Sequence, residues 1–162
     1  MGRGFGGDAG VDSEVFLGNA LTAVDAKGRL SVPAFIRAQI DRVSGARQLW
    51  IGVHESLPCL TVHGAAYHQF LLAQIDGARD GGEHDDREDT VFGMTEDVSY
   101  DPSGRMSLPP MLRDEIGLQD MALFVGRHRY VTMWNPYAAL EHGGERLKKI
   151  AAYRLKERGI SA

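Results

Sequence analysis

Two arginine residues in matching sequence contexts are the first candidates for chemistry in this chain. Arg29 and Arg105 each end the pattern Asp-x-x-Gly-Arg, and Lys27 adds a second cation within the first copy. Lysine and arginine neutralise phosphate groups, and an arginine can also donate two hydrogen bonds to O6 and N7 of a guanine. These residue types suit a ligand that offers phosphates and base edges, although a salt bridge between subunits would employ the same arginines.

A further arginine follows each motif at the same distance. Arg37 and Arg113 each come four residues after a proline, where the start of a helix is expected. A structural ion pair and a contact to phosphate are both compatible with this position. The sequence leaves the two roles open.

The aspartates of the motifs have a structural interpretation. Asp at the first and Gly at the fourth position favour a β-turn in which the carboxylate accepts hydrogen bonds from the backbone. We therefore predict turns formed by Asp25, Gly28, Asp101 and Gly104. The alternative, a small enzyme with paired carboxylates, requires both aspartates to share a cleft with raised pKa values. Turn aspartates are expected to be exposed and ionised, so we predict no catalytic residue.

No other motif indicates an enzyme, a metal site or a cofactor. The six histidines are scattered, and the single cysteine, Cys59, lies in an apolar stretch typical of a core strand. The glycine-rich start matches G-x-G-x-x-G in letters, but no strand precedes it, which excludes a dinucleotide-binding turn. We expect no metal and no cofactor.

The two motifs belong to an internal repeat. Residues 25–37 align without a gap on residues 101–113, and six of the 13 positions are identical. The similarity continues between residues 49–52 and 123–126. Neither copy is long enough to bury much apolar surface alone, so the two copies are expected to pair.

Each motif is expected to join two strands. A short strand precedes it, over 21–24 and 98–100, and the residues after it alternate polar with apolar, as in a half-buried strand. The alternation predicts two faces. The core-facing residues would be Leu30, Val32, Met106 and Leu108, and those facing solvent or a ligand would be Arg29, Ser31, Arg105 and Ser107.

Helices and a second pair of strands complete each copy. Pro33 and Pro109 suit the first turn of a helix. The further predicted strands cover 48–53, 59–63, 123–126 and 130–134. One helix is expected around Leu71 and another, rich in basic residues, around Leu147. The Gly- and acid-rich stretch 76–89 is predicted to be a loop.

The charge and the cysteine content limit the class of protein. The net charge is −4, but residues 76–101 carry ten acidic and two basic side chains, and residues 102–162 carry six acidic and ten basic ones. Because screening limits charge effects to about 8–10 Å, a local basic face is compatible with this total. A single cysteine fits a reducing compartment, and no apolar run approaches the roughly 20 residues that span a bilayer. We expect a cytoplasmic protein.

The stretch from Asp25 to Arg37, repeated from Asp101, resembles the motif of the MraZ family, as do Val125-Gly126 and Trp134-Asn135. The resemblance covers about residues 16–145. It implies an α+β fold of two tandem AbrB-like swapped-hairpin modules, forming a small pseudo-two-fold β-barrel with flanking helices. It also implies a ring-shaped, octamer-like homo-oligomer that binds double-stranded DNA through Lys27, Arg29 and Arg105.

The family's function follows from the same resemblance. Its members are regulators that recognise short repeated promoter elements of the division and cell-wall gene cluster, and we expect a nucleoid-associated repressor. Two features depart from the family pattern. Residues 1–15 extend beyond the usual start, and Ser103 occupies the position of Lys27, so the second motif is less basic.

The expected domain organisation combines the repeat with the charge pattern. A disordered N-terminal extension would cover 1–15, the first module 19–67, a helix and acidic connector 68–94, the second module 95–138, and a C-terminal basic helix 139–162. The main alternative function is a protein-interaction module, such as an antitoxin or a ring scaffold built on the same hairpin. An antitoxin has one hairpin copy and a disordered tail, whereas this chain has two copies and a helical end.

Overall fold

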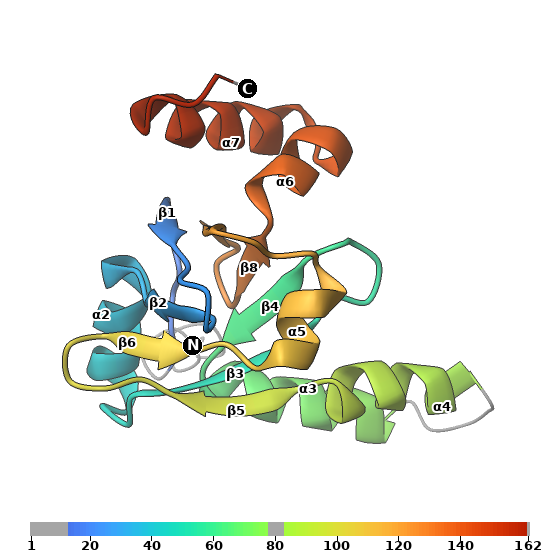
Figure 1. The fold of residues 1–162 in the computed structure, drawn as a ribbon. Coiled ribbons are helices and arrows are strands. Elements are labelled where there is room, and N and C mark those ends of the chain that lie inside the picture. Colours follow the sequence, from blue (N-terminus) through green and yellow to red (C-terminus); the bar gives the residue numbers. More distant parts are fainter. Residues whose placement is uncertain (1–12, 78–82, 162) are drawn as a thin grey trace, which may run out of the picture.

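The computed structural model describes residues 13–77 and 83–161 and has a mixed helix and sheet (α+β) fold (Figure 1). Both halves of the chain follow the same order of elements. The first half contains β1 (Asn19–Ala23), β2 (Arg29–Ser31), α2 (Ala34–Val43), β3 (Gln48–Val53), β4 (Leu60–His63) and α3 (Ala65–Gly77). The second contains β5 (Glu96–Ser99), β6 (Arg105–Ser107), α5 (Pro110–Glu115), β7 (Met121–Gly126), β8 (Val131–Trp134) and α6 (Pro136–His142).

The strands of the two halves are interleaved. Six of them form one antiparallel sheet in the order β1-β7-β8-β4-β3-β5, and β2 and β6 form a separate two-stranded sheet. The first strand of each half therefore pairs with the other half: β1 pairs with β7, and β5 pairs with β3. The repeat seen in the sequence thus becomes an exchange of strands in three dimensions.

The expectation of a closed β-barrel is wrong, because the six-stranded sheet is open, with β1 at one edge and β5 at the other. Helix α7 (Glu145–Glu157) packs at the β1 edge. Arg154 Nη2 donates to the backbone carbonyl of Asn19 at 3.2 Å, and Arg158 Nη2 donates to that of Leu21 at 2.6 Å. The helix thus satisfies carbonyls that a neighbouring strand would otherwise use, and it takes the place of a closing strand.

The main core lies between the two sheets and draws on both halves. Leu30, Val32, Met106 and Leu108, predicted to face inward, are all buried within it, which confirms that alternation. A second, smaller cluster around Trp134 lies under α6 and α7. Each module contributes to one shared core, as the size argument required.

The predicted loop at 76–89 is wrong in its described part, which is helical throughout: residues 76–77 end α3, and residues 78–82 lie outside the described part of the chain. The structure has helix α4 (Glu83–Glu88) followed by a helical turn, η1 (Asp89–Gly93). Arg87 Nε donates to Glu55 Oε1 at 2.8 Å, and Val91 of η1 is buried. The ion pair joins Arg87 to a residue far away in the sequence, and the buried Val91 follows the acidic stretch, so neither contact is visible in the local composition.

Two further expectations concern the ends of the chain. A single basic helix was expected at the C-terminal end, but the structure has two helices, α6 and α7, separated at Gly143 and Gly144. Of the predicted disordered extension 1–15, residues 1–12 lie outside the described part of the chain. In its last three residues, Glu14 is only 3% exposed and the Val15 amide donates to Gln39 Oε1 at 2.9 Å. No helix in the described residues is long and apolar enough to cross a membrane.

Candidate nucleic-acid interface

The β2–β6 sheet has one buried and one exposed face. Its register pairs Arg29 with Ser107, Leu30 with Met106 and Ser31 with Arg105. Leu30 and Met106 are 1% and 3% exposed, whereas the four polar residues are exposed. The two arginines therefore occupy diagonal positions on a small polar surface, which we call the ribbon face and define by Arg29, Ser31, Arg105 and Ser107. A hollow beside it is lined in part by Arg29, Arg105 and Tyr100.

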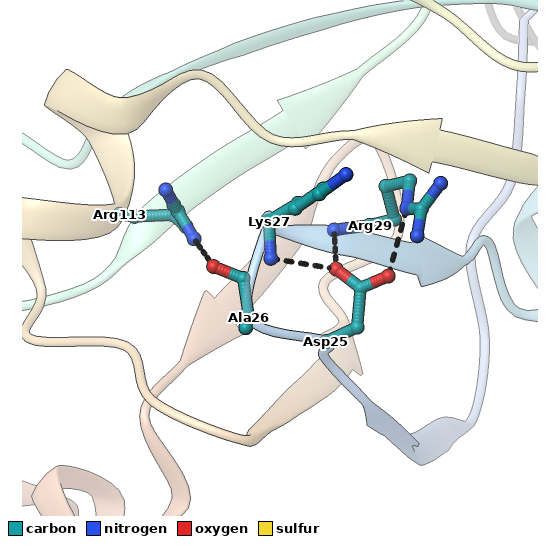
Figure 2. A network of polar contacts seen from close by, with 5 residues as sticks. All are labelled: Asp25, Ala26, Lys27, Arg29 and Arg113. Carbon is teal, nitrogen blue, oxygen red and sulfur yellow. Dashed lines mark hydrogen bonds and ion pairs between the residues drawn. The ribbon is translucent and has the colours of Figure 1, made fainter.

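The first turn is held by the carboxylate of Asp25 (Figure 2). Asp25 Oδ1 accepts hydrogen bonds from the backbone amides of Lys27 and Arg29, each at 2.9 Å, and Oδ2 accepts one from Arg29 Nε at 2.7 Å. The bond from the Arg29 amide, together with that from its side chain, lowers the pKa of Asp25 to about 2. The ion pair also orients Arg29, whose side chain remains 53% exposed, and Lys27 is exposed beside it.

The second turn uses the same backbone bonds but a different side chain. Asp101 Oδ1 accepts from the amides of Ser103 at 3.0 Å and Arg105 at 2.9 Å, and from the Ser103 hydroxyl at 2.7 Å. These bonds, led by that of the Arg105 amide, lower the pKa of Asp101. Ser103 thus supplies a side-chain donor to its aspartate, a role that arginine has in the first turn.

The two aspartates do not meet the requirement of the enzyme alternative. Paired catalytic carboxylates need one raised pKa, and burial or a like charge is what raises it. Both turn carboxylates instead accept several hydrogen bonds, and both pKa values are lowered. Among the described residues there is also no group of three or more His, Cys, Asp or Glu side chains arranged to hold a metal ion.

Two features require glycine in each turn: the backbone conformation and the close approach of a neighbouring side chain. Gly28 and Gly104 have φ angles of +82° and +88°, in the region that side chains disfavour. An added Cβ at Gly28 would lie 2.9 Å from the guanidinium of Arg113, and one at Gly104 would lie 2.8 Å from Nε of Arg37. Each turn is therefore packed against an arginine from the other half of the chain.

For Arg37 and Arg113, the structure bears on one of the two roles left open by the sequence, the structural ion pair, whereas the contact to phosphate stays a prediction. Within residues 13–77 and 83–161, no carboxylate forms an ion pair with either of them. Arg37 Nε donates to the Val32 carbonyl at 2.9 Å, and Arg113 Nη1 donates to the Ala26 carbonyl at 3.4 Å (Figure 2). Both side chains are half-buried.

Two contributors to this region were missed by the sequence reasoning. Tyr100 lines the hollow beside the ribbon face, and its hydroxyl is buried without a hydrogen-bond partner. Ser103, which the sequence marks only as the loss of a positive charge, bonds to Asp101 through its hydroxyl. Ser in a turn commonly bonds to a neighbouring residue, and that general tendency was the available signal.

Comparison with known proteins identifies relatives of this chain in several bacteria. No family model matches the chain. It is 32% identical over 130 residues to a protein of Gluconacetobacter diazotrophicus, covering 77% of this chain and 81% of that protein. It is 35% identical over 124 residues to a protein of Thermomicrobium roseum (75% and 82%), and 32% identical over 127 residues to one of Rickettsia felis (75% and 82%). All three are named transcriptional regulator MraZ.

Proposed function

The chain belongs to the MraZ family of transcriptional regulators, and from this premise we propose that it binds specific DNA sequences through its ribbon face. The observation that carries the proposal is the register of β2 with β6, which sets one arginine from each half on the same exposed surface. Lys27 extends this surface from the first turn. Arg29, Arg105 and Lys27 are the proposed DNA-binding residues.

The chemistry of the ribbon face supports this choice. A two-stranded ribbon fits the major groove of B-DNA, about 12 Å wide, where an arginine can distinguish guanine from other bases. Arg29 is held by Asp25 yet half exposed, so its guanidinium is oriented while donors remain available. A fixed orientation reduces the conformational entropy lost when a base contact forms.

Affinity would depend on repetition, because one subunit offers three cations at this surface. We therefore also propose that the protein acts as a ring-shaped homo-oligomer, octamer-like as in its family, on short repeated promoter elements. Linked sites raise the effective concentration and can increase affinity by about 10²–10⁴ when the spacing of the DNA repeats matches that of the sites.

The remaining parts of the proposal follow from family membership. We propose tandem AbrB-like modules within 19–67 and 95–138, joined by a connector over 68–94 and followed by a basic helical end over 139–162. The exchange of β1 and β5 between the halves supports this organisation. We further propose repression of the division and cell-wall gene cluster, in the cytoplasm and at the nucleoid.

The test is a titration of DNA from upstream of the protein's own gene, with unrelated competitor DNA present and at several salt concentrations. The double variant Arg29→Ala/Arg105→Ala is compared with wild type. If both arginines contact bases, we expect specific affinity to fall about 30-fold to 10,000-fold, because each bidentate contact contributes about 1–3 kcal/mol of discrimination and two contacts are lost. Affinity for competitor DNA should fall much less.

A charge-matched control separates contact from net charge. Arg146 and Lys149 are exposed on α7, which Figure 1 shows at the top of the molecule, away from β2 and β6. The variant Arg146→Ala/Lys149→Ala removes the same number of charges and should retain specific binding. Equal losses in the two double variants, or no preference for the upstream DNA, would instead favour a protein-interaction module.

A further inference from the structure

Arg37 and Arg113 contact the turns in a crossed pattern. Arg37 belongs to α2 of the first half, yet its side chain packs against Gly104 of the second-half turn. Arg113 belongs to α5 of the second half, yet it packs against Gly28 and bonds to the Ala26 carbonyl in the first-half turn. Each half therefore contributes an arginine to the other half's turn.

Backbone hydrogen bonds repeat the same crossing. The Val32 amide donates to the Gly104 carbonyl at 2.7 Å, and the Leu108 amide donates to the Gly28 carbonyl at 2.9 Å. Val32 precedes Arg37 by five residues, and Leu108 precedes Arg113 by five. Each turn glycine is thus held by a backbone amide and an arginine from one segment of the opposite half.

We propose that Arg37 and Arg113 are positioning residues that hold the turn of the opposite half, rather than residues that contact DNA phosphate. By holding both turns, the two residues would keep a fixed spacing between Arg29 and Arg105 on the ribbon face. The importance of this spacing for DNA binding rests on the proposed function. Neither arginine needs to contact Arg29 or Arg105 in this role. Each acts through the glycine and the backbone that it supports.

The two contacts are unequal. Arg37 Nε donates to the Val32 carbonyl, which ties its guanidinium to the strand as well as to Gly104. Arg113 Nε is buried without a hydrogen-bond partner, and its Nη1 bond to Ala26 is long at 3.4 Å. A buried donor without a partner opposes folding, so replacing Arg113 should be less harmful than replacing Arg37.

The test uses amide hydrogen exchange in the full chain without DNA. Arg37→Met and Arg113→Met keep the aliphatic part of each side chain and remove the guanidinium. We expect Arg37→Met to speed exchange about 2- to 10-fold at Gly104 and Arg105, whose amides bond to Asp101, and to leave Gly28 and Arg29 unchanged. Arg113→Met should do the reverse, with a smaller effect.

Each variant is the control for the other, and Arg146→Met on α7 controls for the loss of one charge. Equal acceleration in both turns would indicate general destabilisation and overturn the proposal, as would no acceleration. Should Arg37→Met fail to fold, Arg37→Lys takes its place. Lysine keeps the charge but lacks Nε, so the crossed pattern should still appear.

A DNA titration against salt excludes the phosphate alternative. Loss of a phosphate contact lowers the slope of log affinity against log salt by about 0.9, and lysine would restore it. For a positioning residue, we expect specific affinity to fall with the slope unchanged and no recovery in Arg37→Lys. Because the exchange experiment contains no DNA, it tests the crossed contacts even if the protein proves not to bind DNA.

Discussion

A single side-chain difference distinguishes the two turn arginines. Arg29 donates from Nε to its turn carboxylate, whereas at the second turn the Ser103 hydroxyl donates to Asp101. The ion pair with Asp25 orients Arg29 and partly neutralises its charge, although solvent screens this interaction. The two arginines, which the sequence makes equivalent, are expected to contribute unequally to any ligand that they share.

The ion pair at Asp25 gives a pH-dependent prediction. The pKa of Asp25 is lowered to about 2 from 3.8, so the carboxylate contributes stability above the unfolded-state pKa, which is lost as the pH falls towards 2. Arg29→Ala should raise this pKa part of the way towards 3.8, because the bond from the residue 29 amide persists. Carboxyl-detected NMR titration measures the shift.

Lys27→Ala provides the control for that titration. Lys27 donates to Asp25 through its backbone amide, which alanine keeps. The Asp25 midpoint should therefore stay near its wild-type value in this variant. A rise as large as that in Arg29→Ala would mean that general positive charge, and not the Nε bond, lowers the pKa.

At the scale of elements, the ribbon face depends on the residues beneath it. Leu30 and Met106 lie opposite each other in β2 and β6 and belong to the main core. Each of these strands has three residues, which is too few for a stable pair on their own. Burial of the inner face is therefore what keeps the outer face in place.

Leu30→Ala should lower the free energy of unfolding by about 2–5 kcal/mol, because a buried leucine leaves a cavity when it is shortened. The neighbouring Ser31→Ala, on the exposed face, should change it by less than about 0.5 kcal/mol. Urea denaturation monitored by circular dichroism measures the free energy of unfolding of both variants. Similar values for the two variants would show that the inner face of β2 does not anchor the sheet.

The sequence predicted local features well and distant ones poorly. The alternation around Leu30 and Met106 identified the buried face, because side chains alternate along any strand. The pairing of β2 with β6 and the contact of Arg37 with Gly104 depend on how two distant segments cross, and no local pattern encodes that. The helix at 83–88 also contradicts the local composition, and its contact through Arg87 is to Glu55, which lies elsewhere in the chain.

At the scale of the whole molecule, the two halves are parts of one folding unit. The edge strand of each half pairs with the other half, and the main core contains residues of both. Separating the halves would expose core residues and leave β1 and β5 without partners. The repeat therefore does not correspond to two independent domains.

Fragments test this directly. A chain ending at residue 77 and one beginning at residue 83 should each lack a cooperative unfolding transition, because each loses four strand pairings and part of the shared core. Mixed in equal amounts, they should recover a wild-type-like NMR spectrum. A monomeric fragment with dispersed amide signals on its own would contradict this expectation.

The pairing of β1 with β7 also has a consequence during synthesis. Asn19 faces Val125, so β1 leaves the ribosome about 100 residues before its partner exists. At a synthesis rate of roughly 5–20 residues per second, β1 remains with an unpaired edge for about 5–20 s. During this time, other nascent chains on the same mRNA expose the same unpaired strand. Helix α7, which will cover that edge, is made last. Translation speed through the second half should therefore influence how much of this protein reaches its native state.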